Sequence, residues 1–332
     1  MTMNVCASTL KPGYDGYSPA AIKKLFGGIQ TSPVIEIDFD KDANREDVAS
    51  NIERISGSGV QEKMAAIVDN GKIRLCMSNE QSTHILKPAP LDYDLKARHA
   101  IPPNEHLTMQ IASQAFGIVT AENGLCFDLK GRPVYITKRF DIMSDGSKSQ
   151  MEDFASLIGK TESANGKHYK YEGCYEDIAI AIKSFVAAWP IAIKRFFNIV
   201  VFNYIYGNGD AHLKNFSLQR INDEFVLAPA YDLLNTSLHI NGDDLALNGG
   251  LLRSGWRSAA FDRTGHPCRV DFEAFAEQIG VKSNRLKAIL DNYTIIPNKA
   301  LQLLEHSFLD NKNKRSYARI VEERINRFKR SS

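Results

Sequence analysis

The first part of the chain is organised in short apolar runs separated by turn residues, a pattern that favours strands. It predicts strands over residues 33–39, 64–68, 73–77, 84–87, 125–127 and 134–137. Asp69-Asn70-Gly71 is a tight-turn signal between two of these runs, and Pro88 stops the strand over residues 84–87. Residues 105–116 instead carry apolar side chains at helical spacing, which predicts a helix that ends at Gly117.

Beyond Met151, helical spacing dominates. The most apolar stretch, residues 185–206, is interrupted by a proline and two basic residues, so it predicts a buried helix over residues 191–206 rather than a membrane span. The chain thus changes from β-rich to helical. We expect an α+β, two-lobed, protein-kinase-like fold with a cleft between the lobes, comprising a β-rich N-lobe over residues 1–143 and a helical C-lobe over residues 144–332.

The composition excludes several classes of protein. The chain has 332 residues, of which 43% are hydrophobic and 24% charged, and its net charge is +2. These values are typical of a globular domain and give no overall argument for binding nucleic acid or a membrane. The five cysteines are scattered without a C-x-x-C pair, which argues against a disulfide framework or a zinc site. The N-terminus has no apolar signal core, so we expect a cytoplasmic location.

Basic residues gather near the C-terminus, from Lys312 to Arg330. Glu322 and Glu323 interrupt this run, which favours a solvated helix face. The alternative is a patch that binds an acidic partner or nucleic acid.

Two features of the first part of the chain could contact phosphate. The small residues of Ser56–Gly59 let the backbone approach a ligand and offer N–H groups to phosphate oxygens, although a plain hairpin turn has a similar composition. Lys87 stands in an otherwise apolar strand, so its side chain either reaches water or points into a cleft. Glu105 begins the next helix and could pair with Lys87, which would hold the lysine against the phosphates of a nucleotide.

The segment Asn208–Asn215 carries the most specific signal. Phosphoryl transfer onto a hydroxyl needs a carboxylate beside the acceptor and oxygen ligands for Mg²⁺. Asp210 and Asn215 are five residues apart, which is the spacing of the base and the metal-binding asparagine in kinase catalytic loops. Asp232 follows where the second metal-binding aspartate would come. Turns and helix caps explain one or two such residues, but not the whole cluster.

Motifs of other enzyme classes are absent from the sequence. No G-x-x-x-x-G-K-[ST], H-E-x-x-H or G-x-S-x-G pattern occurs. Of the eight histidines, only His212 lies in a segment rich in candidate chemistry.

The order of these motifs resembles that of the HipA-like serine/threonine kinases, which are toxins of bacterial toxin–antitoxin systems. The matching segments are Lys23–Gly27, Arg54–Lys63, His84–Lys87, Asn104-Glu105, Lys138–Asp141, Glu152–Phe154, Tyr175–Asp177, Asn208–Asn215 and Tyr231–Leu234. The chain is shorter than full-length HipA. It is more similar to the compact HipT form, in which the first N-terminal subdomain is a separate small protein.

The resemblance implies a fold, an activity and a set of site residues. It implies a serine/threonine protein kinase that uses ATP and Mg²⁺. Asp210 would be the catalytic base, acting together with Lys87, Glu105, His212 and Lys214. Asn215 and Asp232 would bind Mg²⁺. The nucleotide would contact Ser58, Gly59, Val60, Gln61, Glu62, Lys63, Lys87, Lys138, Arg139, Phe140, His212, Tyr231 and Asp232, with residues 138–140 as the hinge that holds adenine.

The resemblance also implies regulation by autophosphorylation at Ser56 or Ser58. A phosphate at either serine would place nearly two negative charges where the ATP phosphates must sit, and repulsion would oppose ATP binding. Gly57 stands where the family usually has a bulky apolar residue, which should make this loop more flexible.

Family substrates are aminoacyl-tRNA synthetases, whose phosphorylation on a serine halts translation. The implied partners are a HipB-like helix-turn-helix antitoxin and a small HipS-like protein, with DNA contacted only through the antitoxin and no membrane partner. Two alternatives stay open. One is a non-catalytic kinase-like module that acts in an antitoxin–DNA complex, as the basic C-terminus suggests. The other is a small-molecule kinase that uses the same aspartates and asparagine.

Overall fold

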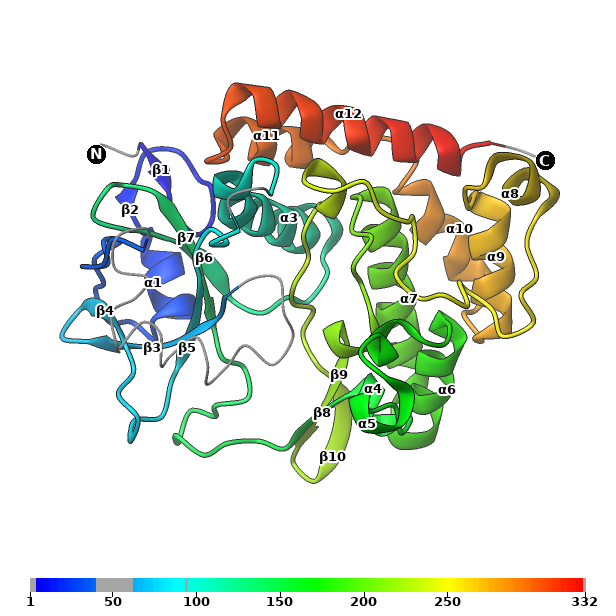
Figure 1. Ribbon diagram of the computed structural model, residues 1–332, viewed down its shortest axis with the longest axis horizontal. Coiled ribbons are helices and arrows are strands. Elements are labelled where there is room, and N and C mark those ends of the chain that lie inside the picture. Colours follow the sequence, from blue (N-terminus) through cyan, green and yellow to red (C-terminus); the bar gives the residue numbers. More distant parts are fainter. Residues whose placement is uncertain (1–3, 40–61, 93–94, 331–332) are drawn as a thin grey trace. The chain divides into compact units, whose positions relative to one another are not determined.

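The computed structural model describes residues 4–39, 62–92 and 95–330, apart from the side chains of Ser283 and Asn284. The chain divides into two compact units, and each is considered by itself. The first unit comprises residues 1–111, 121–142 and 299–314, and the second comprises residues 112–120, 143–298 and 315–332. The α+β class is confirmed, since a sheet dominates the first unit and helices dominate the second (Figure 1).

The first unit is built on a five-stranded antiparallel sheet with the order β4-β3-β5-β7-β6. Its strands are β3 (Met64–Asp69), β4 (Lys72–Leu75), β5 (His84–Lys87), β6 (Asn123–Phe127) and β7 (Pro133–Lys138). The sequence predicts each of them, with small shifts at the ends. In the β3–β4 turn, Asn70 and Gly71 adopt φ values of 49° and 76°, the left-handed pair that a two-residue hairpin requires.

The strand predicted over residues 33–39 is wrong. These residues form only isolated bridges, at Val34 and Ile35, and no ladder. The apolar side chains of the pattern, Ile35, Ile37 and Phe39, are nevertheless buried, and Asp38 is buried between them. The remaining elements of this unit are β1 (Val5–Cys6), β2 (Asp15–Gly16), α1 (Pro19–Leu25) and a 3₁₀ turn over Arg98–Ala100.

Three helices contribute residues to both units, namely α3 (Ile101–Phe116), α11 (Asn298–His306) and α12 (Asn311–Phe328). Helix α3 carries the predicted apolar face, with Leu107 and Ile111 buried. It begins earlier than predicted, at Ile101. Two prolines stand in its first turn, where the backbone N–H groups have no helical acceptor and a proline therefore removes no hydrogen bond.

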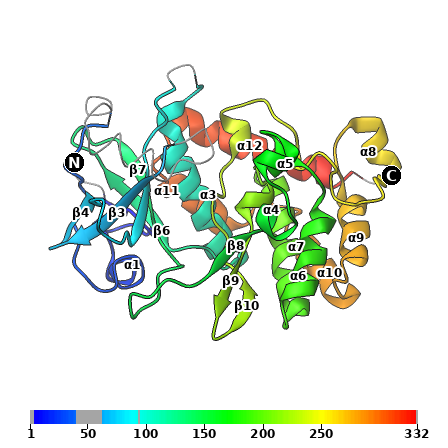
Figure 2. The same cartoon turned by 60° about the horizontal axis from the view of Figure 1, so that its bottom comes forward.

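The second unit is mainly helical, and α6 and α7 lie side by side in both views (Figures 1 and 2). Its helices are α4 (Phe154–Leu157), α5 (Glu162–Asn165), α6 (Tyr175–Phe185), α7 (Trp189–Ile205), α8 (Ala259–Thr264), α9 (Arg269–Gln278) and α10 (Ser283–Asp291). Short 3₁₀ turns occupy Tyr169–Tyr171, Leu213–Asn215 and Thr236–Leu238.

Helix α7 is the buried helix that the sequence predicts. The Phe196 ring is fully buried and packs edge-on against Phe216 and Phe275, with centroid distances of 5.4 and 6.4 Å. Among the residues that the structure describes, no helix is both long and apolar enough to span a membrane.

A three-stranded antiparallel sheet lies where the sequence predicts mainly helices. Its strands are β8 (Met151–Asp153), β9 (Ser217–Ile221) and β10 (Glu224–Leu227), in the order β10-β9-β8. Asn222 and Asp223 join β9 to β10 with φ values of 49° and 64°. Asn-Asp at a left-handed two-residue turn between short apolar runs is a hairpin signal. The pair Asn222-Asp223 is therefore the feature of the sequence that could have predicted this hairpin.

Substitution of Phe196 tests the core of the second unit. We expect Phe196→Ala to lower the free energy of unfolding by about 3–5 kcal/mol, because it removes a buried ring and leaves a cavity. Chemical denaturation would measure the change. The matched control is Ile191→Ala on the same helix, whose side chain is 67% exposed and whose loss should change stability very little. Equal effects of the two substitutions would contradict this account of the core.

Candidate active site

The loop after α7 holds the residues that the sequence singles out. Helix α7 ends at Ile205, and Gly207 turns the chain with a φ of 71°. A Cβ at this glycine would lie 2.8 Å from Asn235 Oδ1, so a side chain would force the turn apart. Asn208 then joins the loop to the helix, because its Nδ2 donates to Asn203 Oδ1 at 3.0 Å.

Asn208 connects the two candidate aspartates. Its Oδ1 accepts the backbone N–H of Asp210 at 3.2 Å, and its Nδ2 lies 3.4 Å from the backbone oxygen of Asp232. The spacing of the kinase motif predicts roles for Asp210, Asn215 and Asp232 but none for this asparagine.

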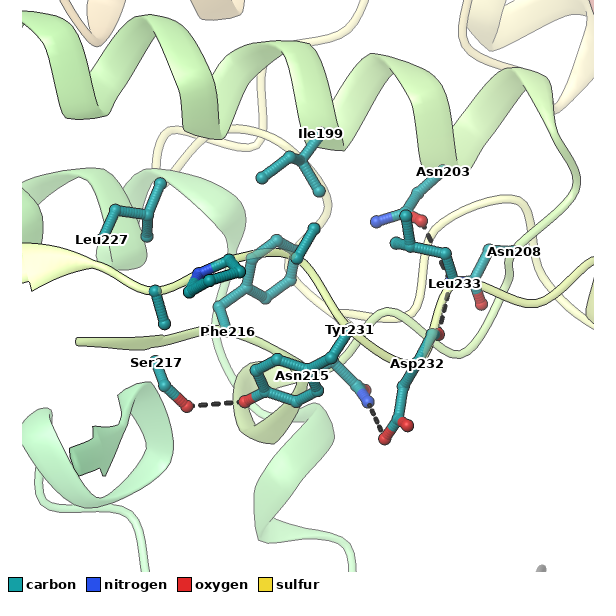
Figure 3. Close-up of a pocket in the computed structure, with 13 residues that line it drawn as sticks. Ile199, Asn203, Asn208, Asn215, Phe216, Ser217, Leu227, Tyr231, Asp232 and Leu233 are labelled. Atoms are coloured by element: carbon teal, nitrogen blue, oxygen red, sulfur yellow. Dashed lines mark hydrogen bonds between the residues drawn. The ribbon is translucent and has the colours of Figure 1, made fainter. Parts of the chain in front are cut away.

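Asn215 and Asp232 lie side chain to side chain (Figure 3). Asn215 Nδ2 donates to Asp232 Oδ2 at 3.2 Å, and Asn215 Oδ1 accepts the backbone N–H of His212 at 3.1 Å. Asp232 has a φ of 55°, in the left-handed region that few residues other than glycine adopt. Such a backbone persists only where its surroundings determine it, and such residues cluster at functional sites. The structure therefore brings together the two residues predicted to bind a metal.

This pair suits Mg²⁺ in the chemistry of its donors. Among the residues that the structure describes, no cluster of three or more histidine, cysteine, aspartate or glutamate side chains could hold a metal ion. An amide oxygen and a carboxylate are hard ligands, and Mg²⁺ is commonly bound by one or two protein oxygens while phosphates and waters complete its shell. The two residues thus fit an ion that arrives with a nucleotide.

Asp210 makes a contact that sequence reasoning missed. Its Oδ1 accepts a hydrogen bond from the Tyr171 hydroxyl at 2.8 Å. Tyr171 lies 39 positions earlier in the chain, and the local pattern of residues does not predict the contact.

His212 is enclosed beside this carboxylate. Its ring packs edge-on against Tyr171 at 5.3 Å, and its Nδ1 has no hydrogen-bond partner within the described part of the chain. Burial lowers the pKa of His212 to about 4, so the ring is neutral near pH 7.

Lys214 and Tyr231 support the loop from its other end. Lys214 Nζ forms an ion pair with Asp153 Oδ2 at 2.7 Å. The Tyr231 hydroxyl donates to the backbone oxygen of Lys214 at 2.9 Å and also bonds Ser217 (Figure 3). A cavity of about 10 Å³ lies between this segment and α7, with Asn203 and Tyr231 in its lining. That volume suits one water molecule and does not admit a nucleotide.

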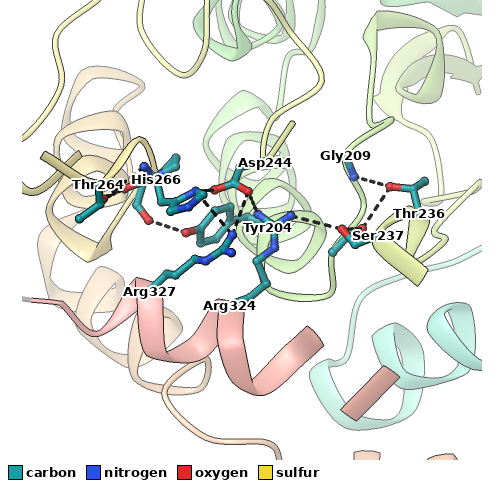
Figure 4. A network of polar contacts seen from close by, with 11 residues as sticks. Tyr204, Gly209, Thr236, Ser237, Asp244, Thr264, His266, Arg324 and Arg327 are labelled. Atoms are coloured by element: carbon teal, nitrogen blue, oxygen red, sulfur yellow. Dashed lines mark hydrogen bonds and ion pairs between the residues drawn. The ribbon is translucent and has the colours of Figure 1, made fainter. Parts of the chain in front are cut away.

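The hydroxyl groups of Thr236 and Ser237 form hydrogen bonds with the backbone at the start of the loop (Figure 4). Gly209 N donates to Thr236 Oγ1 at 2.8 Å, and that hydroxyl donates to Gly207 O at 3.2 Å. Ser237 Oγ also donates to Gly207 O, at 3.1 Å, and accepts from Arg324 at 3.3 Å.

Arg324 in turn forms an ion pair with Asp244, and both side chains are largely buried, at 6% and 11% exposure. Arg327 and His266 contact the same carboxylate at 3.3 and 2.8 Å (Figure 4). Two of the arginines in the basic C-terminal run thus neutralise an internal aspartate. The solvated face expected for that run is therefore wrong for these two residues.

In the first unit, Lys87 pairs with Glu105 as predicted. Lys87 Nζ lies 2.6 Å from Glu105 Oε1, and the two side chains are 6% and 1% exposed. The ammonium group also lies 5.3 Å from the centre of the Tyr135 ring, opposite Lys87 in the sheet. This side chain does not extend into water, so the simpler interpretation of a lysine in an apolar strand is wrong.

The predicted hinge residues begin at Lys138, the last residue of β7. Lys138 N bonds Glu122 O, and Arg139 N bonds Thr83 O, at 2.8 and 2.9 Å. The Arg139 guanidinium is bound to Asp141 at 2.6 Å, and Phe140 is partly buried.

The predicted phosphate loop is only partly described. Ser56, Ser58, Gly59, Val60 and Gln61 lie outside the described residues. Glu62 and Lys63 are partly buried just before β3, and Glu62 Oε1 lies 3.5 Å from the backbone nitrogen of Leu91.

Comparison with known proteins identifies the family. Residues 55–300 match the model of the HipA-like C-terminal domain. The chain belongs to the HipA-like family. The HipA-like resemblance inferred from the order of the motifs is therefore confirmed.

Curated relatives of this HipA-like chain carry kinase names. A Haemophilus influenzae protein named "Putative kinase" is 26% identical over 92% of this chain and 92% of its own length. The Sinorhizobium fredii protein "Putative kinase Y4mE" is 29% identical over 55% of this chain, but the match spans only 43% of Y4mE. The chain thus spans less than half the length of one relative and nearly all of the other.

A solved structure shares the HipA-like fold. The structure is the complex of HipA, HipB and operator DNA from the Shewanella oneidensis toxin–antitoxin system. The match has a TM-score of 0.62 and 20% identity, and covers 82% of this chain and 65% of the other. At this identity the likeness concerns the fold alone.

The buried ion pair behind the loop yields a stability prediction. We expect Asp244→Ala to lower the free energy of unfolding by about 3–5 kcal/mol, because it leaves Arg324 buried without its counter-charge. Denaturant titration would measure this loss. Arg319 lies on α12, as Arg324 does. Arg319→Ala removes an exposed ion pair with Glu323, so its free energy of unfolding should equal that of wild type. An Asp244→Ala protein as stable as wild type would show that the pair does not support the loop.

Proposed function

We propose that this chain is a serine/threonine protein kinase that transfers the γ-phosphate of ATP to a serine of a protein. The observation that carries this proposal is the pairing of Asn215 with Asp232 on the loop that also presents Asp210. The buried Lys87–Glu105 pair in the first unit and the kinase names of the relatives support it.

The proposed chemistry gives each residue a role. Asp210 takes the proton of the serine hydroxyl while the serine oxygen forms a bond to the γ-phosphorus of ATP. The bond between the γ-phosphorus and the oxygen that bridges to the β-phosphate breaks, and ADP leaves with its electron pair. Asn215 and Asp232 would hold Mg²⁺, which neutralises charge on the phosphates when bound. Lys87, oriented by Glu105, would contact the phosphates as a further positive charge.

The remaining residues would bind the nucleotide or hold the loop. Residues 58–63 would cover the phosphates, and Lys138, Arg139 and Phe140 would contact adenine. His212, Lys214 and Tyr231 keep the loop of Asp210 and Asn215 in shape through the contacts described above.

The family resemblance supports a finer proposal. The target would be an aminoacyl-tRNA synthetase in the cytoplasm, whose phosphorylation would inhibit translation. Autophosphorylation at Ser56 or Ser58 would restrain the kinase. The Shewanella HipA occurs with HipB and operator DNA, which supports a HipB-like antitoxin as partner here, with DNA contacted through that partner. A HipS-like protein would be a further partner.

No specific observation favours the alternatives. Two of the C-terminal arginines that a non-catalytic, DNA-binding module could use, Arg324 and Arg327, are instead bound to Asp244. A small-molecule kinase would use the same Asp210, Asn215 and Asp232, so the acceptor has to be established by experiment.

Transfer of ³²P from ATP tests the proposal. Purified, dephosphorylated protein with Mg²⁺ should label itself or a member of a panel of purified aminoacyl-tRNA synthetases. We expect Asp210→Ala to reduce labelling by at least about 100-fold, because the acceptor hydroxyl loses its base. Asp223→Ala, in the exposed β9–β10 turn, should label like wild type. The kinase assignment is wrong if wild type labels no more than Asp210→Ala.

A further inference from the structure

We propose that Tyr171 is a positioning residue for the proposed base, holding Oδ1 of Asp210 so that Oδ2 is presented to the acceptor hydroxyl. This inference rests on the proposed kinase function. Its starting point is the 2.8 Å hydrogen bond from the Tyr171 hydroxyl to Asp210 Oδ1. No hydrogen bond from a described residue reaches the other carboxylate oxygen, which is therefore available to a substrate.

The Tyr171 ring is fixed by its neighbours. Its face is covered by the Lys170 ammonium, 5.0 Å from the ring centre, and the His212 ring packs edge-on at 5.3 Å. A ring held between a cation and a second ring has few rotamers to lose when its hydroxyl binds a carboxylate, so the contact is largely preorganised.

The backbone of this tyrosine is tied to a second segment of the unit. Tyr171 O accepts from Asn248 N at 2.9 Å, and Gly173 O accepts from Gly249 N at 2.8 Å. Beyond them, Tyr175 N donates to Gly250 O at 3.0 Å. Because successive backbone hydrogen bonds join the two segments, Tyr171 belongs to a fixed part of the unit.

The approach of the two segments depends on glycine. A Cβ on Gly249 would lie 2.7 Å from Gly173 O. Gly173 itself has a φ of 105°, and a Cβ there would lie 2.6 Å from an oxygen of Asp177. Any side chain at Gly249 would push the segments apart and move the Tyr171 hydroxyl from Asp210.

Tyr175 provides an internal comparison. It belongs to the same segment, and its hydroxyl donates to the backbone oxygen of Ala211 at 3.0 Å. Both tyrosines thus hold the loop through one hydrogen bond each, but only Tyr171 bonds the carboxylate that would act as base. Comparing variants of the two tyrosines therefore distinguishes a residue that supports the loop from one that positions the base.

A hydrogen bond fixes the direction of a carboxylate only while the donor keeps its proton. Burial and the Asp210 charge both raise the pKa of Tyr171, so the hydroxyl stays protonated and donates across the working pH range. The titratable and charged groups around Asp210 and its neighbour His212 are Tyr171, Tyr175, Lys170 and Asp232. Of these, only Tyr171 donates a hydrogen bond to the Asp210 side chain.

The experiment compares Tyr171→Phe with Tyr175→Phe in the full chain. The initial rate of ³²P transfer from ATP, to the protein itself or to whichever synthetase of the panel wild type labels, is measured against ATP concentration. Thermal unfolding of each variant is measured alongside. We expect Tyr171→Phe to lower the rate at saturating ATP by about 10- to 100-fold, because the base is no longer held in place. The KM for ATP should stay near that of wild type.

The comparison with Tyr175 adds a readout that a merely structural role would not give. Tyr171→Phe should lose rate at saturating ATP while its unfolding temperature changes little, because its hydroxyl bonds a side chain and not the backbone of the loop. Tyr175→Phe should unfold at a lower temperature, because its hydroxyl bonds the loop backbone, and should lose less rate than Tyr171→Phe.

The possible failures are distinguishable. Wild-type protein that labels neither itself nor any synthetase of the panel overturns the kinase function, and this assignment with it. An active wild type combined with a Tyr171→Phe rate equal to wild type overturns the assignment of Tyr171 alone. An equal loss of rate in both variants also overturns it, because the effect would then belong to the loop as a whole.

Discussion

The hydrogen bond between Asn203 and Asn208 ties the polar loop to the hydrophobic core. Asn203 lies in the last turns of α7 and is itself buried. A buried amide has to find partners, and here its partner is the residue that also bonds Asp210 and Asp232. Packing of α7 therefore sets the position of both aspartates. The proposed chemistry depends on an apolar helix that takes no part in it.

Charge balance inside the second unit adds a second constraint. Asp244 is largely buried and receives Arg324 and Arg327 from α12. Arg324 also donates to Ser237, whose hydroxyl donates to Gly207 O at the start of the loop. The end of the chain thereby supports the loop through one ion pair and two hydroxyl bonds. Counting basic residues along the sequence could not separate such internal pairing from a surface patch, because the aspartate lies about 80 positions away.

Local pattern was enough to predict much of the fold and the main cluster of the site. The strands around Lys87 and the apolar helix α7 have strong periodicity and clear turn residues, and Asp210, Asn215 and Asp232 stand close in sequence. Tyr171 could not be found in this way, because its role arises only when distant segments meet. The strand expected near Ile35 is absent for a different reason, since alternating apolar side chains can be buried without a partner strand.

Gly249 illustrates how a residue without a side chain can restrict what an active site tolerates. It has no acid, base or ligand to offer, yet the space it leaves empty lets the segment of Tyr171 come within hydrogen-bond distance of its neighbour. A larger residue at this position would leave every catalytic side chain of the proposed site in the sequence but would change how these side chains are aligned. Retention of the proposed activity among relatives would then depend on a glycine at this position as well as on the aspartates.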